Sequence, residues 1–445
     1  GDWDAVIITH SAFERIQVSV ETRIGVLEDE INALNQQRAF ATDKRQQAKI
    51  DKQIDKLAAE IERLKKVGQK DGRMMWEGLK VDQIFVDEAD RYKNLAVKSR
   101  RASGNQIPGI GVAPSARAEN LFLKTRSMQK QFGEGKGVVF ATGTPISNSL
   151  VELYNLQRFL DYEYLQKKGI SNFDAWANLF ADTVADLEMK PSGDGYEIKT
   201  RIAKFRNVLE LRRQIQRFAD AQMDLDKLGV QRPKLFGDKT EVISVDLTPE
   251  QAEYFRKLGE RADNLKYVSP EQDNMLKITG DGRKAALDLR LVDPKYPDNP
   301  NSKLNRAVAN ICDIYKKTTG VSLEGVGDNQ NLTQVIFCDM GTPKEGEFNI
   351  YDDIKQKLVK MGVPENEIAF IQDYKKDEEK FQLFQDFNEG KVRILIGSTE
   401  MIGAGVNIQK RLFAAHHLDT PWRPRDIEQR NGRILRPKNL NKVVR

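Results

Sequence analysis

The segment Ile84-Phe85-Val86-Asp87-Glu88-Ala89-Asp90 is an apolar run that ends in two adjacent acids. Its apolar part, which begins at Val81, is typical of a buried strand. In open α/β sheets, ligands bind at the carboxyl ends of the strands. Asp87 is therefore a candidate for holding Mg²⁺, and Glu88 for orienting and deprotonating an attacking water. The same two acids are also typical of the start of a helix, so these residues alone leave both interpretations open.

Two other segments place small and hydroxyl residues directly after predicted strands. Thr142, Gly143 and Thr144 follow the strand 138–141, and Thr399 follows the strand 392–396. Glycines and hydroxyl groups at such positions allow close approach to phosphates. Ordinary turns have the same composition, so each segment by itself is weak evidence. The pair of glycines that comes next, Gly403 and Gly405, is a candidate cofactor-binding site.

A basic segment, 429–436, overlaps the end of the predicted helix 424–434. Gln429, Arg433 and Arg436 are spaced four and three residues apart, which puts them on one helix face. Two guanidinium groups on one face are suited to clamp a phosphate and to stabilise charge that develops on it. A solvated basic face is the alternative interpretation.

Strands and helices alternate around these segments, which predicts βαβ units and a parallel sheet. The fold class is therefore α/β, with two lobes and a helical region between them. The predicted domains are residues 1–160, 161–300 and 301–445. Strands are also predicted at Trp3–Thr9 and Thr240–Asp246, and a helix at Phe205–Leu228.

Residues 14–70 have a different pattern, with apolar residues spaced alternately four and three apart between Ile16 and Leu64. This spacing is typical of a coiled-coil seam. An interruption near Phe40–Asp43 predicts two antiparallel helices. We expect this coiled-coil arm to be inserted in the first lobe and to be a spacer or a docking site for a protein partner.

Composition excludes several classes of protein. The chain has 445 residues, 39% hydrophobic and 31% charged, which excludes a disordered or fibrous chain. No apolar run approaches the roughly 20 residues of a membrane span. Only two cysteines are present, which fits a reducing, cytoplasmic location. Residues 410–445 contain ten Lys or Arg and three Asp or Glu, which favours a polyanionic partner or a solvated basic tail.

Taken together, the motifs and their order resemble helicase superfamily two, and in detail the Swi/Snf-type double-stranded DNA translocases. Residues 87–94 resemble motif II, although Asp90 stands where that branch usually has His. The other similar segments are 142–148 with Glu152 and Leu153 (motif III), 302–304, 334–338 (motif IV), 397–407 (motif V), and Asp419, Trp422-Arg423-Pro424 and 429–436 (motif VI). Helicase segments of very large phage and conjugative-element proteins look similar, and some of those carry a DNA adenine methylase; no methylase motif is present here.

This resemblance implies two RecA-like lobes, the first incomplete at its N-terminus, and an ATP- and Mg²⁺-dependent motor on double-stranded DNA. It implies that Asp87 and Glu88 act on magnesium and water, and that Gln429, Arg433 and Arg436 act on the γ-phosphate. Coupling of hydrolysis to lobe closure is implied for Thr142, Gly143 and Thr144. Contact with nucleic acid is implied for Lys93, Thr399 and Trp422.

One required motif is missing, because the chain has no Gly-Lys-Thr or Gly-Lys-Ser tripeptide for the phosphate loop of motif I. The chain also begins at Gly1 rather than at methionine. We therefore expect a fragment of a longer protein, with little ATPase activity by itself. Two alternatives remain: a DEAD-box RNA helicase, favoured by the literal Asp-Glu-Ala-Asp of residues 87–90, and a non-catalytic DNA-binding or docking module.

Overall fold

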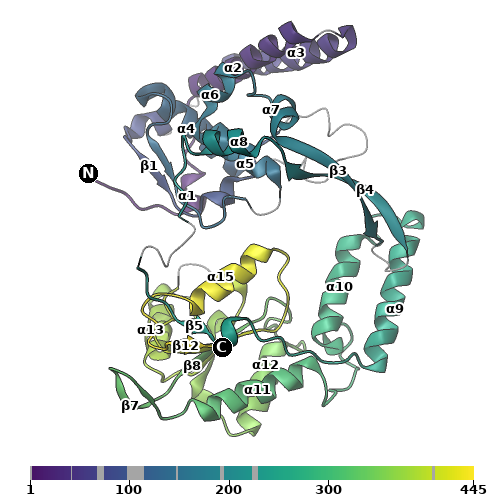
Figure 1. The fold of residues 1–445 in the computed structure, drawn as a ribbon, viewed down its shortest axis with the longest axis vertical. Helices are drawn as coiled ribbons and strands as arrows, with labels where there is room; N and C mark the ends of the chain where they lie inside the picture. Colours follow the sequence, from purple (N-terminus) through teal and green to yellow (C-terminus); the bar gives the residue numbers. More distant parts are fainter. Residues whose placement is uncertain are drawn as a thin grey trace. The chain divides into compact units, whose positions relative to one another are not determined.

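The computed structural model describes residues 3–41, 43–67, 75–97, 115–146, 149–190, 195–222, 229–402 and 406–445. The chain forms two compact units (Figure 1). The first comprises Gly1–Glu188 and Ile198–Ala221, and the second comprises Met189–Glu197 and Gln222–Arg445. Residues 161–300, predicted as one helical region, are thus divided between the two units.

The first unit is built on two parallel strands, β1 (Ile84–Val86) and β2 (Val138–Phe140), in which Ile84 pairs with Val138. The inward side chains of these strands pack with α4 (Ala116–Phe132), whose buried residues include Leu121 and Met128. Phe85 and Val139 lie on the opposite face of the strands and are exposed. Helix α5 (Leu150–Leu160) follows β2 and begins at the capping side chain of Ser149.

A second apolar cluster of the first unit surrounds the fully buried Trp176, whose Nε1 donates to Gln157 Oε1 at 3.0 Å. It lies next to two strands that the sequence did not predict, β3 (Ala181–Met189) and β4 (Tyr196–Phe205). The remaining elements of the unit are α1 (His10–Phe13), η1 (Trp76–Leu79), η2 (Ala89–Tyr92), α6 (Tyr162–Lys167), α7 (Phe173–Phe180), β3 (Ala181–Met189), β4 (Tyr196–Phe205) and α8 (Val208–Ile215).

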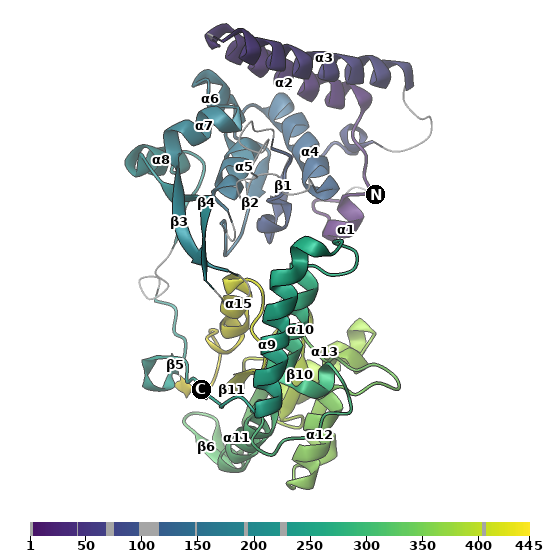
Figure 2. The ribbon, with the colours of Figure 1, turned by 90° about the vertical axis from the view of Figure 1, so that its right-hand side faces the viewer.

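Two long helices, α2 (Val20–Phe40) and α3 (Lys44–Val67), lie side by side in both views (Figures 1 and 2). Their shared core contains Leu34, Ala41, Ile50 and Leu57. The helices occupy the segment for which the heptad-like spacing predicted an arm; a supercoiled geometry stays a prediction.

The second unit contains a four-stranded parallel sheet in the order β11-β8-β10-β9. The strands are β8 (Thr333–Phe337), β9 (Ile368–Phe370), β10 (Ile394–Gly397) and β11 (Leu412–His417). Parallel strands alternating with helices confirm the predicted α/β class for this part of the chain.

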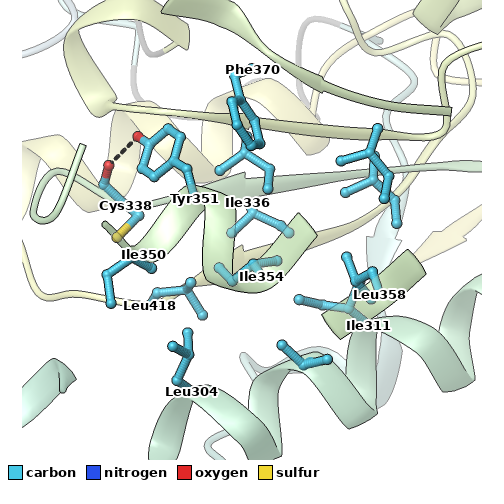
Figure 3. Close-up of a cluster of buried hydrophobic side chains, with 14 of the residues drawn as sticks. Leu304, Ile311, Ile336, Cys338, Ile350, Tyr351, Ile354, Leu358, Phe370 and Leu418 are labelled. Carbon is cyan, nitrogen blue, oxygen red and sulfur yellow. Dashed lines mark hydrogen bonds between the residues drawn. The ribbon is translucent and has the colours of Figure 1, made fainter. Parts of the chain in front are cut away.

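Helices cover both faces of this sheet. Ile336 and Ile396 point to α11 (Lys303–Lys317) and α12 (Ile350–Lys360), where Tyr351 Oη donates to the carbonyl of Cys338 at 2.6 Å (Figure 3). Val335 and Phe337 point to the other face, to α13 (Asp377–Asn388) and α15 (Pro424–Ile434). This period-two alternation buries both sides of each strand, which explains the continuous apolar runs in the sequence.

The other elements of the second unit surround this sheet. A helix pair, α9 (Pro249–Asp263) and α10 (Met275–Leu287), begins at a capping box on Thr248. The shorter elements are β5 (Lys234–Leu235), η4 (Phe236–Asp238), η5 (Asn264–Tyr267), η6 (Leu289–Leu291), β6 (Val321–Leu323), β7 (Gly327–Gln330), η7 (Glu365–Glu367), η8 (Ile371–Asp373), α14 (Thr399–Ile402) and β12 (Val443–Val444). No helix in the described part of the chain is long and apolar enough to cross a bilayer.

Three predicted elements are wrong in the structure. Trp3–Thr9 forms no strand, and Ile7 is fully exposed, because β1 and β2 pair only with each other among the described strands. Thr240–Asp246 contains no strand or helix. The predicted helix Phe205–Leu228 is reduced to α8, and its end at 223–228 lies outside the described residues. A segment with apolar patterning forms the predicted strand or helix only when a neighbouring element is available for it to pack against.

Candidate functional site

The acidic turn after β1 has a strained backbone. Glu88 has φ 49°, in the left-handed region that residues other than glycine rarely adopt. Its N–H donates to Asp87 Oδ1 at 3.0 Å, and the N–H of Ala89 donates to the carbonyl of Ala141 at 3.0 Å. These bonds hold the turn at the carboxyl end of the strand pair. Asp87 is exposed there and Glu88 is partly exposed.

Asp90 links this acidic turn to the segment after β2. Its carboxylate is buried and accepts a hydrogen bond from Thr142 Oγ1 at 3.0 Å. Thr142 Oγ1 in turn accepts from the N–H of Thr144 at 3.1 Å, across Gly143. The structure therefore brings together the predicted catalytic acids and the predicted coupling residues. In this chain Asp90, in place of the expected His, makes that connection.

A buried arginine joins the strand ends of the second unit. Arg430 of α15 is fully buried, and its Nη2 lies 2.8 Å from Asp339 Oδ2 and 2.9 Å from Asp419 Oδ1. Its Nε donates to Thr399 Oγ1 at 2.8 Å. Asp339 follows β8, Thr399 follows β10 and Asp419 follows β11. One side chain thus binds residues at the carboxyl ends of three strands.

The partners of Arg430 also bind one another. The N–H of Thr399 donates to Asp339 Oδ1 at 2.6 Å, and the N–H of Asp339 donates to Asp419 Oδ2 at 2.6 Å. Arg430 was not among the predicted site residues because it lies off the helix face shared by Gln429, Arg433 and Arg436. The signal that would have identified it is the pair of acids, Asp339 and Asp419, that follow two neighbouring strands.

Arg433 and Arg436 converge on one backbone group. Arg433 Nη1 donates to the carbonyl of Val406 at 3.0 Å, and Arg436 Nη1 donates to the same carbonyl at 2.8 Å. Gln429 is partly exposed one turn before Arg433 on the same helix. Val406 belongs to the predicted motif V, whose Gly403 and Gly405 lie outside the described residues.

Comparison with known proteins identifies the family of the chain. Residues 1–223, half of the chain, match the family of probable helicase domains, and residues 329–438 match the helicase conserved C-terminal domain. The chain belongs to the helicase family. It is also 31% identical over 191 residues to the "Defense against restriction protein B" of Escherichia phage P1. The match covers 42% of this chain and 8% of that protein, so the helicase chain corresponds to a small part of its relative.

Two residues of the helicase chain that were predicted to contact nucleic acid make internal contacts. Lys93 Nζ lies 2.8 Å from Glu152 Oε1, and these two side chains are 10% and 6% exposed. Thr399 Oγ1 donates to Asp339 Oδ2 at 2.9 Å and accepts from Arg430. These positions do not favour the predicted contacts, because each polar group is already bound within its own unit. Contact of either residue with nucleic acid stays a prediction.

Trp422, the third residue with a predicted nucleic-acid contact, is 58% exposed. The guanidinium carbon of Arg283 lies 4.8 Å from the centre of its ring, and Arg283 Nη2 donates to the carbonyl of Thr420 at 2.8 Å. An exposed indole stacked with a guanidinium group is compatible with the predicted contact.

His10 lies near the acidic turn but was not among the site residues predicted from the sequence. The ring of His10 stacks on Tyr92 with their centres 5.3 Å apart. Burial lowers the pKa of His10, and the positive charges of Arg91 and Arg117 lower it further. A neutral imidazole is therefore favoured next to Asp87. A single histidine at the end of an apolar run carries no sequence signal for this position.

The described residues form no cluster of three or more His, Cys, Asp or Glu side chains suited to a metal ion. Magnesium in nucleotide sites is typically held by one or two carboxylates together with phosphates and water. The exposed Asp87 fits that requirement as the protein ligand.

His416 of β11 predicts a dependence of stability on pH. Its Nε2 lies 2.9 Å from Gln334 Oε1. Burial lowers its pKa to about 4, and the positive charges of His417 and Arg445 contribute. Below pH 6.5 the unfolded chain binds a proton that the folded chain does not, so stability falls as the pH drops from 6.5 towards 4 and is unaffected above that range.

We expect this loss to be about 1–2 kcal/mol at pH 5, measured by urea unfolding at pH 7.5 and pH 5. A His416→Gln variant, which keeps a side chain able to bond Gln334, should lose less over the same interval. Equal losses in the two proteins would contradict the assignment to His416.

Proposed function

We propose that this helicase chain is the motor part of an ATP-driven translocase on double-stranded DNA, of the Swi/Snf type. The observation that carries the proposal is the bond between Asp90 and Thr142, which joins the acidic turn after β1 to the turn after β2. Because the acidic turn after β1 is bonded to the turn after β2, a shift of the acidic turn when a nucleotide binds or is hydrolysed would move the turn after β2 as well. The order of the motifs and the helicase comparisons support the same conclusion.

The chain's own residues have distinct proposed roles. Asp87 would hold Mg²⁺, which supplies positive charge to a nucleotide's phosphates. Glu88 would orient a water molecule and take its proton. Gln429, Arg433 and Arg436 would bind the γ-phosphate, the two arginines through charge-assisted hydrogen bonds.

The phosphate loop is the missing part of this proposal. The 445 residues contain no Gly-Lys-Thr or Gly-Lys-Ser tripeptide. We therefore propose that these residues alone have low ATPase activity, and that a longer polypeptide containing them together with such a loop is the active enzyme.

The test is ATPase activity of both polypeptides, with and without duplex DNA and duplex RNA. We expect stimulation by duplex DNA in the longer polypeptide, and a loss of about a hundredfold in kcat for Glu88→Gln, because the general base is removed. Asp82→Asn, at an exposed acid just before β1, is the matched control and should leave kcat unchanged.

The other outcomes separate the alternatives. Stronger stimulation by duplex RNA would favour the DEAD-box interpretation. No ATPase activity in either polypeptide, with salt-sensitive DNA binding retained, would favour a non-catalytic module. Robust DNA-stimulated turnover by the 445 residues alone would overturn the proposed need for a separate phosphate loop.

A further inference from the structure

The outer face of α3 carries an excess of positive charge. Ile50, Ile54 and Leu57 of α3 pack in the core shared with α2, and Ile61 and Leu64 continue the same apolar spacing. Positions two residues further along the helix lie about 200° around it, on the opposite face. These five positions, together with two exposed cations of the preceding turns, are called the outer stripe: Arg45, Lys49, Lys52, Lys56, Ala59, Arg63 and Lys66.

All seven residues of the outer stripe are exposed, and six of them are cations. The four acids of α3 lie outside these seven positions, and the two nearest to them, Asp55 and Glu62, are also exposed. Helix α3 as a whole contains eight Lys or Arg and four Asp or Glu, so cations outnumber acids two to one on it, whereas the whole chain is nearly balanced, with 71 basic and 66 acidic residues.

Three of the four acids of α3 form ion pairs: Asp51 with Arg38 of α2, Glu62 with Lys65, and Glu60 with a cation of the stripe. The fourth acid, Asp55, is exposed at the edge of the stripe. Within the stripe, only Arg63 has an acidic partner, Glu60, at 2.5 Å. No acid among the described residues forms an ion pair with the other five cations of the outer stripe.

Helix α2, the inner helix of the pair, contains more acidic than basic residues. Helix α2 packs on α4, where Asp29 Oδ2 lies 3.5 Å from Arg126 Nη2. It contains four acids, Glu21, Glu28, Asp29 and Glu30, and two arginines. Both views show α3 on the outer side of α2 (Figures 1 and 2). The outer stripe is therefore directed away from the body of the first unit.

We propose that the outer stripe of α3 is a binding surface for the phosphate backbone of double-stranded DNA. The stripe runs over residues 45–66, about 31 Å at ~1.5 Å per residue, close to the ~34 Å of one turn of B-form DNA. Four of its six cations are lysines, which attract phosphates as point charges without reading bases. Helix α3 contains no aromatic residue, so it lacks the stacking contacts typical of single-strand binding.

This proposal rests on the proposed function only in taking duplex DNA as the ligand. It adds a contact surface outside the motor motifs, which would bind DNA whether or not nucleotide is present. Its proposed role is to keep the motor on its track through contacts that do not depend on sequence.

The test is binding of the full chain to a fluorescein-labelled 30-base-pair duplex without nucleotide, by fluorescence anisotropy between 50 and 200 mM NaCl. We expect a Lys49→Glu, Lys52→Glu, Lys56→Glu triple variant to raise Kd at least tenfold. It should also lower the slope of log Kd against log salt by two to three, since each lost phosphate contact removes about 0.9. The corresponding Lys→Gln triple variant should raise Kd about threefold to fivefold.

The matched control is a Lys136→Glu, Lys168→Glu, Lys295→Glu triple variant, which changes the net charge equally at exposed lysines elsewhere. Its Kd should stay within twofold of the parent. Thermal unfolding of each variant checks that the fold is intact. An unchanged Kd in the stripe variant, or an equal loss in stripe and control variants, would overturn the proposal.

Two further outcomes would also overturn it. Tighter binding of duplex RNA than of duplex DNA would reject the assigned ligand. Loss of polyglutamate binding with unchanged DNA binding would assign the stripe to an acidic protein. Failure of this proposal is distinguishable from failure of the proposed function: DNA-stimulated ATPase activity with an unchanged Kd in the stripe variant rejects the stripe alone.

Discussion

Replacing Arg433 with alanine is expected to lower the kcat of the DNA-stimulated ATPase by about a thousandfold or more. In the proposed function this guanidinium stabilises charge on the γ-phosphate, a contribution of about 10³–10⁵ where an arginine finger acts. The local structure should survive, because Arg436 Nη1 still donates to the carbonyl of Val406 at 2.8 Å. The measurement is steady-state ATPase kinetics of the longer polypeptide with saturating duplex DNA.

The control for this substitution is Arg306→Ala, at an exposed arginine on α11 of the same unit. It should change kcat by less than twofold. Arg433→Lys should not restore the activity, since a single ammonium group lacks the forked donors of a guanidinium. A kcat within threefold of the parent in Arg433→Ala would contradict the role proposed for this residue.

Replacing Arg430 with methionine is expected to destabilise the second unit by about 3–5 kcal/mol. The substitution leaves Asp419, whose side chain is 4% exposed, buried without its counter-charge. It also removes the bonds that join the ends of β8, β10 and β11 to α15. The measurement is urea unfolding followed by circular dichroism, combined with hydrogen exchange of the amides in these strands.

A combined variant tests the physical reason for this loss. Adding Asp339→Asn and Asp419→Asn to Arg430→Met removes the uncompensated charges, and should recover part of the lost stability. Arg430→Lys should be intermediate, because one ammonium group cannot reach all the acceptors that Arg430 binds. A loss below about 1 kcal/mol in the single variant would show that the buried arginine is not what holds these strand ends together.

The alternation of strands and helices in the second unit was predictable from the sequence. Its strands are buried on both faces and therefore appear as continuous apolar runs. Helix α15 begins at Pro424 and ends at Ile434, as the sequence predicted, and proline is favoured in the first turn of a helix. These signals are local, so they did not depend on knowing the neighbours of each element.

The predictions failed where an element needs a partner distant in the chain. Trp3–Thr9 and Thr240–Asp246 have strand-like composition, but no described strand pairs with them. Strands β3 and β4 show the opposite case. They form strands in the structure, but their mixed polar composition has no strong strand pattern, so they were not predicted. Strand formation depends on cross-strand neighbours, which a single segment does not specify.

The sequence by itself determined the order of the motifs, their positions after strands, and the helix face shared by Gln429, Arg433 and Arg436. Only the tertiary structure decided which polar groups meet: Asp90 with Thr142, Lys93 with Glu152, and Arg430 with both Asp339 and Asp419. The physical reason is that a helix or strand repeats over a few residues, whereas burial and pairing depend on the elements that pack around each side chain. Whether a charged side chain is exposed to solvent or forms a buried ion pair is therefore decided by the folded structure and not by the local sequence.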